Sequence, residues 1–229
     1  MKPRSLIFCL LITLPTISVA QVSDSIYYNR LYYVGKLWGH VKYYHSEVAK
    51  GDVDWDNELI QALESIKTAP DNDAFNNTLL SFLSTAGDIG DASGFKPSFP
   101  DSLNNNTDFS WIQNDIFSDS VQSILENIWD RFSPQDNVYV NAGSAGNPTF
   151  NNDNGLYESA HYPKEHERIL ALFRYWNIIN YFFPYKYIMD QDWDITLLEF
   201  IPPIVQAQSA LSYNLAFKEL TTRINDSHA

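Results

Sequence analysis

Apolar and aromatic residues recur every three or four positions in two stretches of the chain. In the first stretch the repeating positions are Tyr27, Leu31, Val34, Trp38, Val41 and His45. In the second stretch they are Ile169, Leu172, Trp176, Ile179 and Phe183. This spacing predicts one amphipathic helix in each stretch, because a helical turn takes 3.6 residues. Pro184 should end the second helix, since the residue before a proline is pushed out of the helical conformation.

Each predicted helix is followed by a short acidic turn and two further helical patterns. The second-helix positions are Leu59, Ile60, Leu63 and Ile66, matched by Leu197, Leu198, Ile201 and Ile204. The third-helix positions are Phe75, Leu79, Phe82 and Ala86, matched by Tyr213, Phe217, Leu220 and Ile224. Asp54 or Asp56, and Asp192 or Asp194, are placed to cap the second helix. The pair at residues 202–203 is Pro-Pro, which should kink or break that helix.

The two stretches are copies of one another. At an offset of 138 residues, residues 30–88 align with residues 168–226 without a gap, and 12 of the 59 pairs are identical. The identical pairs include Arg30/Arg168, Trp38/Trp176, Tyr43/Tyr181, Leu59/Leu197, Asn76/Asn214 and Asp88/Asp226. The sequence therefore predicts a mainly α fold of two duplicated three-helix units, residues 24–88 and 165–229. Each unit has one apolar seam, which should be buried against the other unit.

Residues 89–164 connect the two predicted units. Residues 91–108 are rich in Gly, Pro, Ser, Asn and Asp, which predicts an exposed loop. Residues 109–132 have a helical pattern, with Trp111, Ile116, Val121, Leu125, Ile128 and Trp129 as candidate buried positions. The alternation in residues 137–150, followed by Gly and Pro, suggests a hairpin or a short edge strand.

Residues 1–20 have the features of a secretory signal peptide. Lys2 and Arg4 precede an apolar run at residues 6–14, and Ser18-Val19-Ala20 supplies the small residues of a cleavage site. The alternative is a buried N-terminal helix. The run is too short to span a bilayer, and no later segment is long enough. We therefore expect an exported protein, periplasmic or extracellular, with Gln21 at its mature N-terminus.

Composition narrows the function classes. The net charge of −13 argues against nucleic-acid binding, which needs a basic face. The single cysteine excludes a disulfide scaffold and a cysteine-based zinc site. The aromatic share of 15% is too high for a disordered chain.

The sequence predicts no metal or cofactor site. His40 and His45 are five residues apart, as are His161 and His166, whereas two ligands on one helix face need a spacing of three or four. The side chains of the Glu-His-Glu run at residues 165–167 should point in different directions, because the run lies at the start of a predicted helix. No phosphate loop or dinucleotide fingerprint is present.

The sequence also predicts no catalytic residues. The Asp-Trp-Asp motif at residues 54–56 is repeated at residues 192–194 and could supply paired carboxylates for catalysis. Its presence in both copies instead favours a structural role, in which an aspartate caps the helix and the tryptophan is buried. Ser144 lies in Gly-Ser-Ala-Gly, which does not fit the Gly-x-Ser-x-Gly elbow. Asp226-Ser227-His228 contains the residue types of a triad, but triad members must converge from different elements.

Three regions resemble the N-terminal region of exported tail-specific (C-terminal-processing) serine peptidases of the Bacteroidetes type. The first comprises residues 36–45 and 54–56, the second residues 173–177, 181–186 and 192–194, and the third residues 223–229. The resemblance spans nearly the whole chain after residue 20. Its motifs are aromatic and are not catalytic signatures.

This resemblance implies a non-catalytic helical region of a secreted serine endopeptidase that supports substrate access or domain arrangement. In that family a PDZ-like domain and an α/β core with a serine nucleophile and a lysine base follow, and here they would come after Ala229. No position matches that dyad, so none is assigned and enzymatic activity of the chain itself is left open. Its partner would be a polypeptide substrate, met through the full-length parent. The alternative is a stand-alone helical binding or scaffold protein of the cell envelope. Substrate and oligomeric state stay open.

Overall fold

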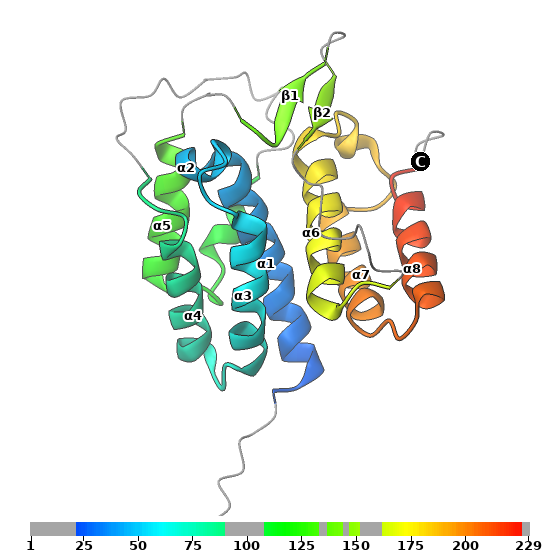
Figure 1. Ribbon diagram of the computed structural model, residues 1–229, viewed down its shortest axis with the longest axis horizontal. Coiled ribbons are helices and arrows are strands. Elements are labelled where there is room, and N and C mark those ends of the chain that lie inside the picture. The colour runs from blue at the N-terminus through cyan, green and yellow to red at the C-terminus, as the bar shows by residue number, and fades with distance from the viewer. Residues whose placement is uncertain (1–21, 90–107, 133–136, 144–146, 152–161, 226–229) are drawn as a thin grey trace, which may run out of the picture.

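The computed structural model describes residues 22–89, 108–132, 137–143, 147–151 and 162–225. These residues form eight α-helices and one two-stranded antiparallel sheet, so the protein is mainly helical (Figure 1). None of the helices among them is both long and apolar enough to cross a membrane. The predicted signal peptide and nearly all of the predicted loop at residues 91–108 lie outside the described residues.

The helices recur at the predicted offset of 138 residues. Unit 1 contains α1 (Asp24–Tyr44), α3 (Trp55–Thr68) and α4 (Asn72–Ser84), and unit 2 contains α6 (Glu165–Phe182), α7 (Trp193–Val205) and α8 (Ala210–Thr222). The bounds of α4 and α8 differ by that offset at both ends. Short turns of helix follow the first helix of each unit, namely α2 (Ser46–Ala49) and the 3-10 turn η3 (Lys186–Ile188).

Local sequence signals set most of the helix ends. Asp54 caps α3 by accepting a hydrogen bond from the Asn57 amide, and Asp192 caps α7 through the Asp194 amide. The first helix of unit 2 ends at Phe182, two residues before Pro184, as predicted. The core joins both units, and its tryptophans Trp38, Trp55, Trp176 and Trp193 are all buried.

The Pro-Pro pair was predicted to kink or break this helix, and it does not break α7. The helix continues through both prolines to Val205. The prolines remove the amide donors to the carbonyls of Leu198 and Glu199, which belong to exposed residues on the outer side of the helix. Leu198, predicted to be buried, is on this outer side and is 45% exposed.

The segment at residues 109–132 is not one helix as predicted. It comprises the 3-10 turn η2 (Ser110–Gln113) and α5 (Asp119–Asp130). The Asn76 side chain interrupts it, because its amide donates to the Ile116 carbonyl and accepts from the Ser118 amide. Of the six predicted buried positions, Trp111, Val121, Leu125 and Ile128 are buried, while Ile116 and Trp129 are half-buried.

The predicted hairpin is confirmed. Strands β1 (Val140–Ala142) and β2 (Pro148–Phe150) pair antiparallel, with Val140 opposite Phe150. The hairpin lies at the end of the molecule where α1 and α6 finish (Figure 1). The amide of Val138, which leads into β1, donates a hydrogen bond to the Ala49 carbonyl at 2.9 Å.

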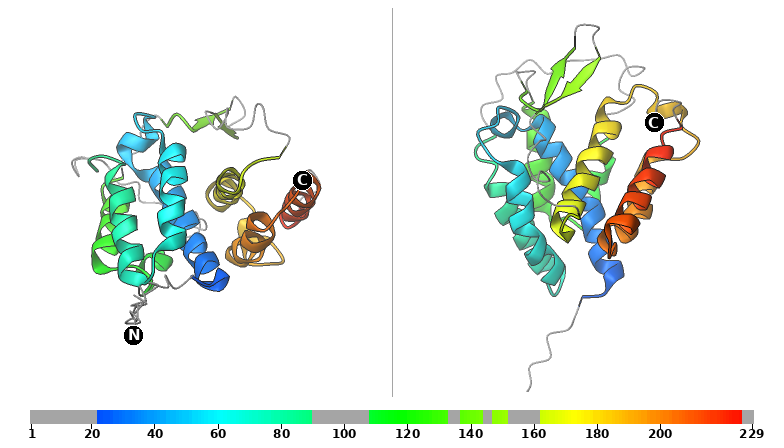
Figure 2. Two further views of the ribbon diagram at one scale, coloured as in Figure 1. Left: turned by 60° about the horizontal axis from the view of Figure 1, so that its bottom comes forward. Right: turned by 45° about the vertical axis from the view of Figure 1, so that its right-hand side comes forward.

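The two units meet along α1 and α6. Figure 2 shows these helices between the other helices of each unit. They run in the same direction, because Tyr27 contacts Glu165 near their starts and Tyr43 contacts Tyr181 near their ends. Helix α1 also packs on α7, and α3 packs on α6. The apolar seams of the units are therefore buried against one another, as predicted.

Candidate functional site

The interface between the units is built from equivalent positions. Tyr27 and Glu165 are offset by 138 residues and touch, and so do Tyr43 and Tyr181, whose rings are 5.6 Å apart. Contacts between equivalent positions arise when two copies are related by a two-fold axis, here running along α1 and α6. The duplicated units therefore pack as a pseudo-symmetric dimer within one chain.

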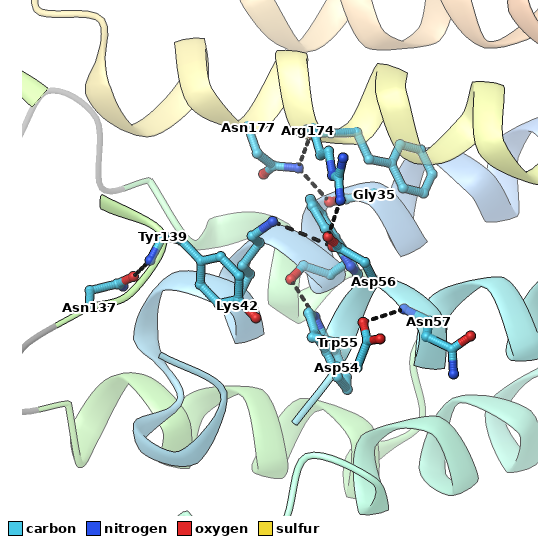
Figure 3. Close-up of polar contacts among 12 residues, drawn as sticks. Gly35, Lys42, Asp54, Trp55, Asp56, Asn57, Asn137, Tyr139, Arg174 and Asn177 are labelled. Atoms are coloured by element: carbon cyan, nitrogen blue, oxygen red, sulfur yellow. Dashed lines mark hydrogen bonds and ion pairs between the residues drawn. The ribbon is translucent and has the colours of Figure 1, made fainter. Parts of the chain in front are cut away.

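Small residues of α1 receive large residues of α6 at this axis. A Cβ on Gly35 would lie 2.8 Å from the Phe173 ring, and a Cβ on Gly39 would lie 1.9 Å from Asn177 Oδ1. Asn177 Nδ2 donates to the carbonyls of Gly35 and Phe173, both at 2.9 Å (Figure 3). These glycines are equivalent to Phe173 and Asn177, so the duplicated positions have become complementary rather than identical.

Two of the ion pairs that cross the interface are equivalent under the same offset. Lys36 of α1 reaches Asp194 of α7 at 2.6 Å, and Arg174 of α6 reaches Asp56 of α3. Asp56 also forms an ion pair with Lys42, whose Nζ lies 3.4 Å from Asp56 Oδ1 (Figure 3). The Asp56 side chain is 10% exposed and that of Asp194 is 37% exposed, so the two pairs lie in different surroundings.

The Asp-Trp-Asp motif thus has three separate structural tasks in each unit. The first aspartate caps the helix, and the tryptophan Nε1 donates to a carbonyl of the first helix, Trp55 to Trp38 and Trp193 to Trp176, each at 3.0 Å. The second aspartate forms the ion pair across the interface. The capping prediction is confirmed for Asp54 and Asp192, while Asp56 and Asp194 hold the two units together.

A cavity of about 310 Å³ opens beside one of these ion pairs. Its charged and amide lining comprises Lys36, Asp108, Asn180, Lys186, Gln191, Asp192 and Asp194. Lys186 Nζ donates to Asn180 Oδ1 at 2.8 Å, and burial lowers the pKa of this lysine. Such a lining offers both hydrogen-bond donors and acceptors, which suits binding of a small polar group.

The equivalent position in unit 1 is filled. Lys42 stands where unit 2 has Asn180, and its ammonium lies 4.6 Å from the centre of the Trp38 ring and 4.4 Å from that of the Tyr139 ring. Tyr139 belongs to the segment leading into the hairpin (Figure 3). The connecting segment therefore closes one of the two equivalent sites.

A second hollow, of about 240 Å³, lies between α3 and α6. Glu165 lines it and accepts hydrogen bonds from Lys67 Nζ at 2.8 Å and from the Tyr27 hydroxyl at 3.5 Å. Burial, followed by the charge of Glu165, raises the pKa of Tyr27. His166 also lines this hollow.

Among the described residues, the other candidate residues do not come together in one site. His40 and His45 are both buried, and His40 Nε2 bonds the Leu125 carbonyl at 3.0 Å. Glu167 bonds the backbone amide of Lys164 at the start of α6. Within the described residues no three His, Cys, Asp or Glu side chains are grouped to hold a metal ion. Ser144, His161 and the Asp-Ser-His run at residues 226–228 lie outside the described residues.

Sequence reasoning missed the ion pairs across the interface, although a signal was present. At the repeat offset Lys36 matches Arg174 and Asp56 matches Asp194, so a basic and an acidic residue are kept in both copies. Periodicity alone places Lys36 and Arg174 on helices without indicating a partner. The pairing follows only when the two copies are related by a two-fold axis.

Comparison with known protein families, curated proteins and solved structures finds no match for this chain.

Proposed function

We propose that this chain is the non-catalytic N-terminal helical region of an exported serine endopeptidase of the tail-specific type. The main support is that the motif residues of the resemblance have structural tasks in the folded protein. Trp38, Asp54 and Asp56 serve burial, capping and pairing in unit 1, and their equivalents do so in unit 2. Such a double unit with a shared core suits the arrangement of neighbouring domains or the access of a polypeptide substrate.

A stand-alone helical binding or scaffold protein of the envelope is the second candidate. The observation that favours it is the open polar cavity beside Lys36. At the equivalent position of unit 1, Lys42 and Tyr139 fill the space. The reading frame downstream of Ala229 distinguishes the two. A PDZ-like segment followed by a core with serine and lysine supports the peptidase region, whereas a stop codon favours the scaffold.

The activity test uses the purified chain from Gln21 to Ala229 with an unfolded protein substrate and a fluorophosphonate probe for reactive serines. We expect no turnover and no labelling, and expect activity only in a longer chain that includes the downstream core. Proteolysis that disappears in Ser227→Ala, with labelling of Ser227, would show that this region is itself an enzyme.

Export is tested separately by mass spectrometry of the native protein. The basic residues, apolar run and Ser-Val-Ala site predict Gln21 as its first residue. A membrane-bound product that retains residues 1–20 would contradict export with cleavage.

A further inference from the structure

Unit 1 carries a helix that unit 2 lacks among the described residues. Helix α5 packs on α1 and α4. His40 Nε2 bonds the Leu125 carbonyl, the Tyr44 ring lies 5.4 Å from the Trp129 ring, and the Tyr33 ring lies 5.5 Å from that of Phe117. Positions 33, 37, 40 and 44 therefore form the line on α1 that α5 and the turn before it cover.

Asn76 of α4 fixes the start of this added helix. Its Nδ2 donates to the Ile116 carbonyl at 2.9 Å, and its Oδ1 accepts from the Ser118 amide at 2.7 Å. Ser118 in turn caps α5 through the Val121 amide. One asparagine thus holds both sides of the turn that leads into the helix.

Among the described residues, no helix covers the equivalent surface of unit 2. On α6 the equivalent line is Ala171, Tyr175, Ile178 and Phe182, which is apolar or aromatic throughout and half-buried. Its last residue, Phe182, packs on Phe150 of the hairpin, so the open part of the line is at the first three positions. The ring centres of Tyr175 and Phe217 of α8 are 6.4 Å apart, and these two rings fill the space between α6 and α8. We call this surface the α6–α8 face. No described helix lies over it in the views of Figures 1 and 2.

The asparagine that holds α5 is also present in unit 2. Asn214 of α8 is identical to Asn76 at the repeat offset, is exposed, and has no hydrogen bond from its side chain to any described residue. Leu211, one turn before it, is 69% exposed and replaces the exposed Asp73 of unit 1. The α6–α8 face thus keeps the anchoring amide and has an exposed leucine one turn before it.

We propose that the α6–α8 face binds an amphipathic helix of a partner polypeptide, in the position that α5 occupies on unit 1. The apolar side of the partner helix would lie on α6. The backbone of the turn that precedes the partner helix would form hydrogen bonds with the Asn214 side-chain amide. Lys218 and Thr221 replace Leu80 and Leu83 on the Asn214 side of α8, so the bound helix would present polar or acidic groups there. Helix-in-groove binding of this kind uses anchors at i, i+4 and i+7.

This inference rests on the repeat and holds for either function proposed above. Its test uses a fluorescent peptide with the sequence of residues 114–132, the segment that forms α5 and its leading turn. Fluorescence anisotropy would follow its binding to the chain from Gln21 to Ala229, with a scrambled peptide as control. We expect saturable binding of the first peptide only.

Variants locate the bound peptide. Asn214→Ala should weaken binding about 10-fold or more through the loss of two hydrogen bonds. Ile178→Glu should remove binding because it places a charge under the apolar line. Asn77→Ala, an exposed asparagine on α4, should leave binding unchanged. Circular dichroism would verify that each variant is folded.

Three results would overturn the inference. These are no saturable binding, binding that is unchanged in both Asn214→Ala and Ile178→Glu, and self-association of the chain in sedimentation experiments that Ile178→Glu abolishes. The last would assign the face to a second copy of the protein instead of a partner helix.

Discussion

At the residue scale, the repeat shows how equivalent positions take different chemistry. His40 is buried and polar, whereas its equivalent Ile178 is half-buried and apolar. His40 Nε2 forms a hydrogen bond with the Leu125 carbonyl, and the rings of Phe109, Trp111 and Tyr44 pack around the imidazole. A histidine in such surroundings is held neutral, because burial penalises the charged imidazolium.

His40 should therefore make stability depend on pH. Burial lowers the pKa of His40 to about 4 from the ordinary 6.5. Because the unfolded chain takes up a proton between pH 6.5 and 4 and the folded chain does not, stability is full above pH 6.5 and falls as pH falls through this window. The loss from this group should reach roughly 2–3 kcal/mol near pH 4.5.

The measurement is urea unfolding of the native chain and of His40→Ile at pH 7.5 and pH 4.5. The variant takes the residue of the equivalent position in unit 2. It should lose less stability on acidification than the native chain, although His45, whose pKa is also lowered by burial, contributes to both. Equal losses in the two proteins would contradict the assignment to His40.

At the element scale, the close approach of α1 and α6 depends on glycine. Gly35 and Gly39 are one turn apart on α1 and face Phe173 and Asn177 of α6. Neither glycine needs an unusual backbone conformation here, since both lie inside a regular helix. Their role is to leave space for the larger residues of the partner helix.

We predict that Gly39→Ala destabilises the protein. In an exposed helix this change would stabilise by about 1 kcal/mol. Here the new Cβ would lie 1.9 Å from Asn177 Oδ1 and 2.2 Å from its Cγ, so overpacking should cost roughly 1–3 kcal/mol and reverse the sign. Thermal and urea unfolding would measure the change.

The matched background is Asn177→Ala, which removes the side chain that the new methyl group would meet. In that background Gly39→Ala should be neutral or stabilising, as in an ordinary helix. A loss of the same size in both backgrounds would mean that the glycine is required for another reason.

At the scale of the whole molecule, two similar units are joined by two equivalent ion pairs of unequal burial. Asp56 is enclosed and meets both Arg174 and Lys42, while Asp194 meets Lys36 near the surface. Removing one partner of a buried pair leaves a buried charge uncompensated, whereas an exposed charge is still solvated by water. The two aspartates should therefore differ in their contribution to stability.

We predict that Asp56→Asn lowers the free energy of unfolding by about 3 kcal/mol or more. Asp194→Asn, its equivalent in unit 2, should lower it by about 1 kcal/mol or less. The midpoint of urea unfolding should shift for Asp56→Asn without a change in slope if unfolding stays two-state. Similar shifts for both variants would show that burial does not distinguish the two pairs.

The sequence by itself determined the six repeated helices, the repeat and the middle hairpin. Apolar periodicity and the 138-residue offset carry this information, because a helix face and a duplicated unit leave their pattern in the order of residues. It also left a choice between Asp54 and Asp56 as the cap of α3. The local bond from the Asn57 amide makes Asp54 the cap, whereas the role of Asp56 depends on Arg174, which lies 118 residues away in the chain and approaches it only after folding.

Only the tertiary structure decided how the units meet and which surfaces remain open. The two-fold relation, the contact of Gly39 with Asn177 and the closure of one cavity by Tyr139 each join residues far apart in the chain. The structure also corrected two helix predictions. Pro202 and Pro203 are tolerated on the outer side of α7, and the Asn76 amide interrupts the segment before α5. Periodicity could decide neither, because each depends on where other parts of the folded chain lie.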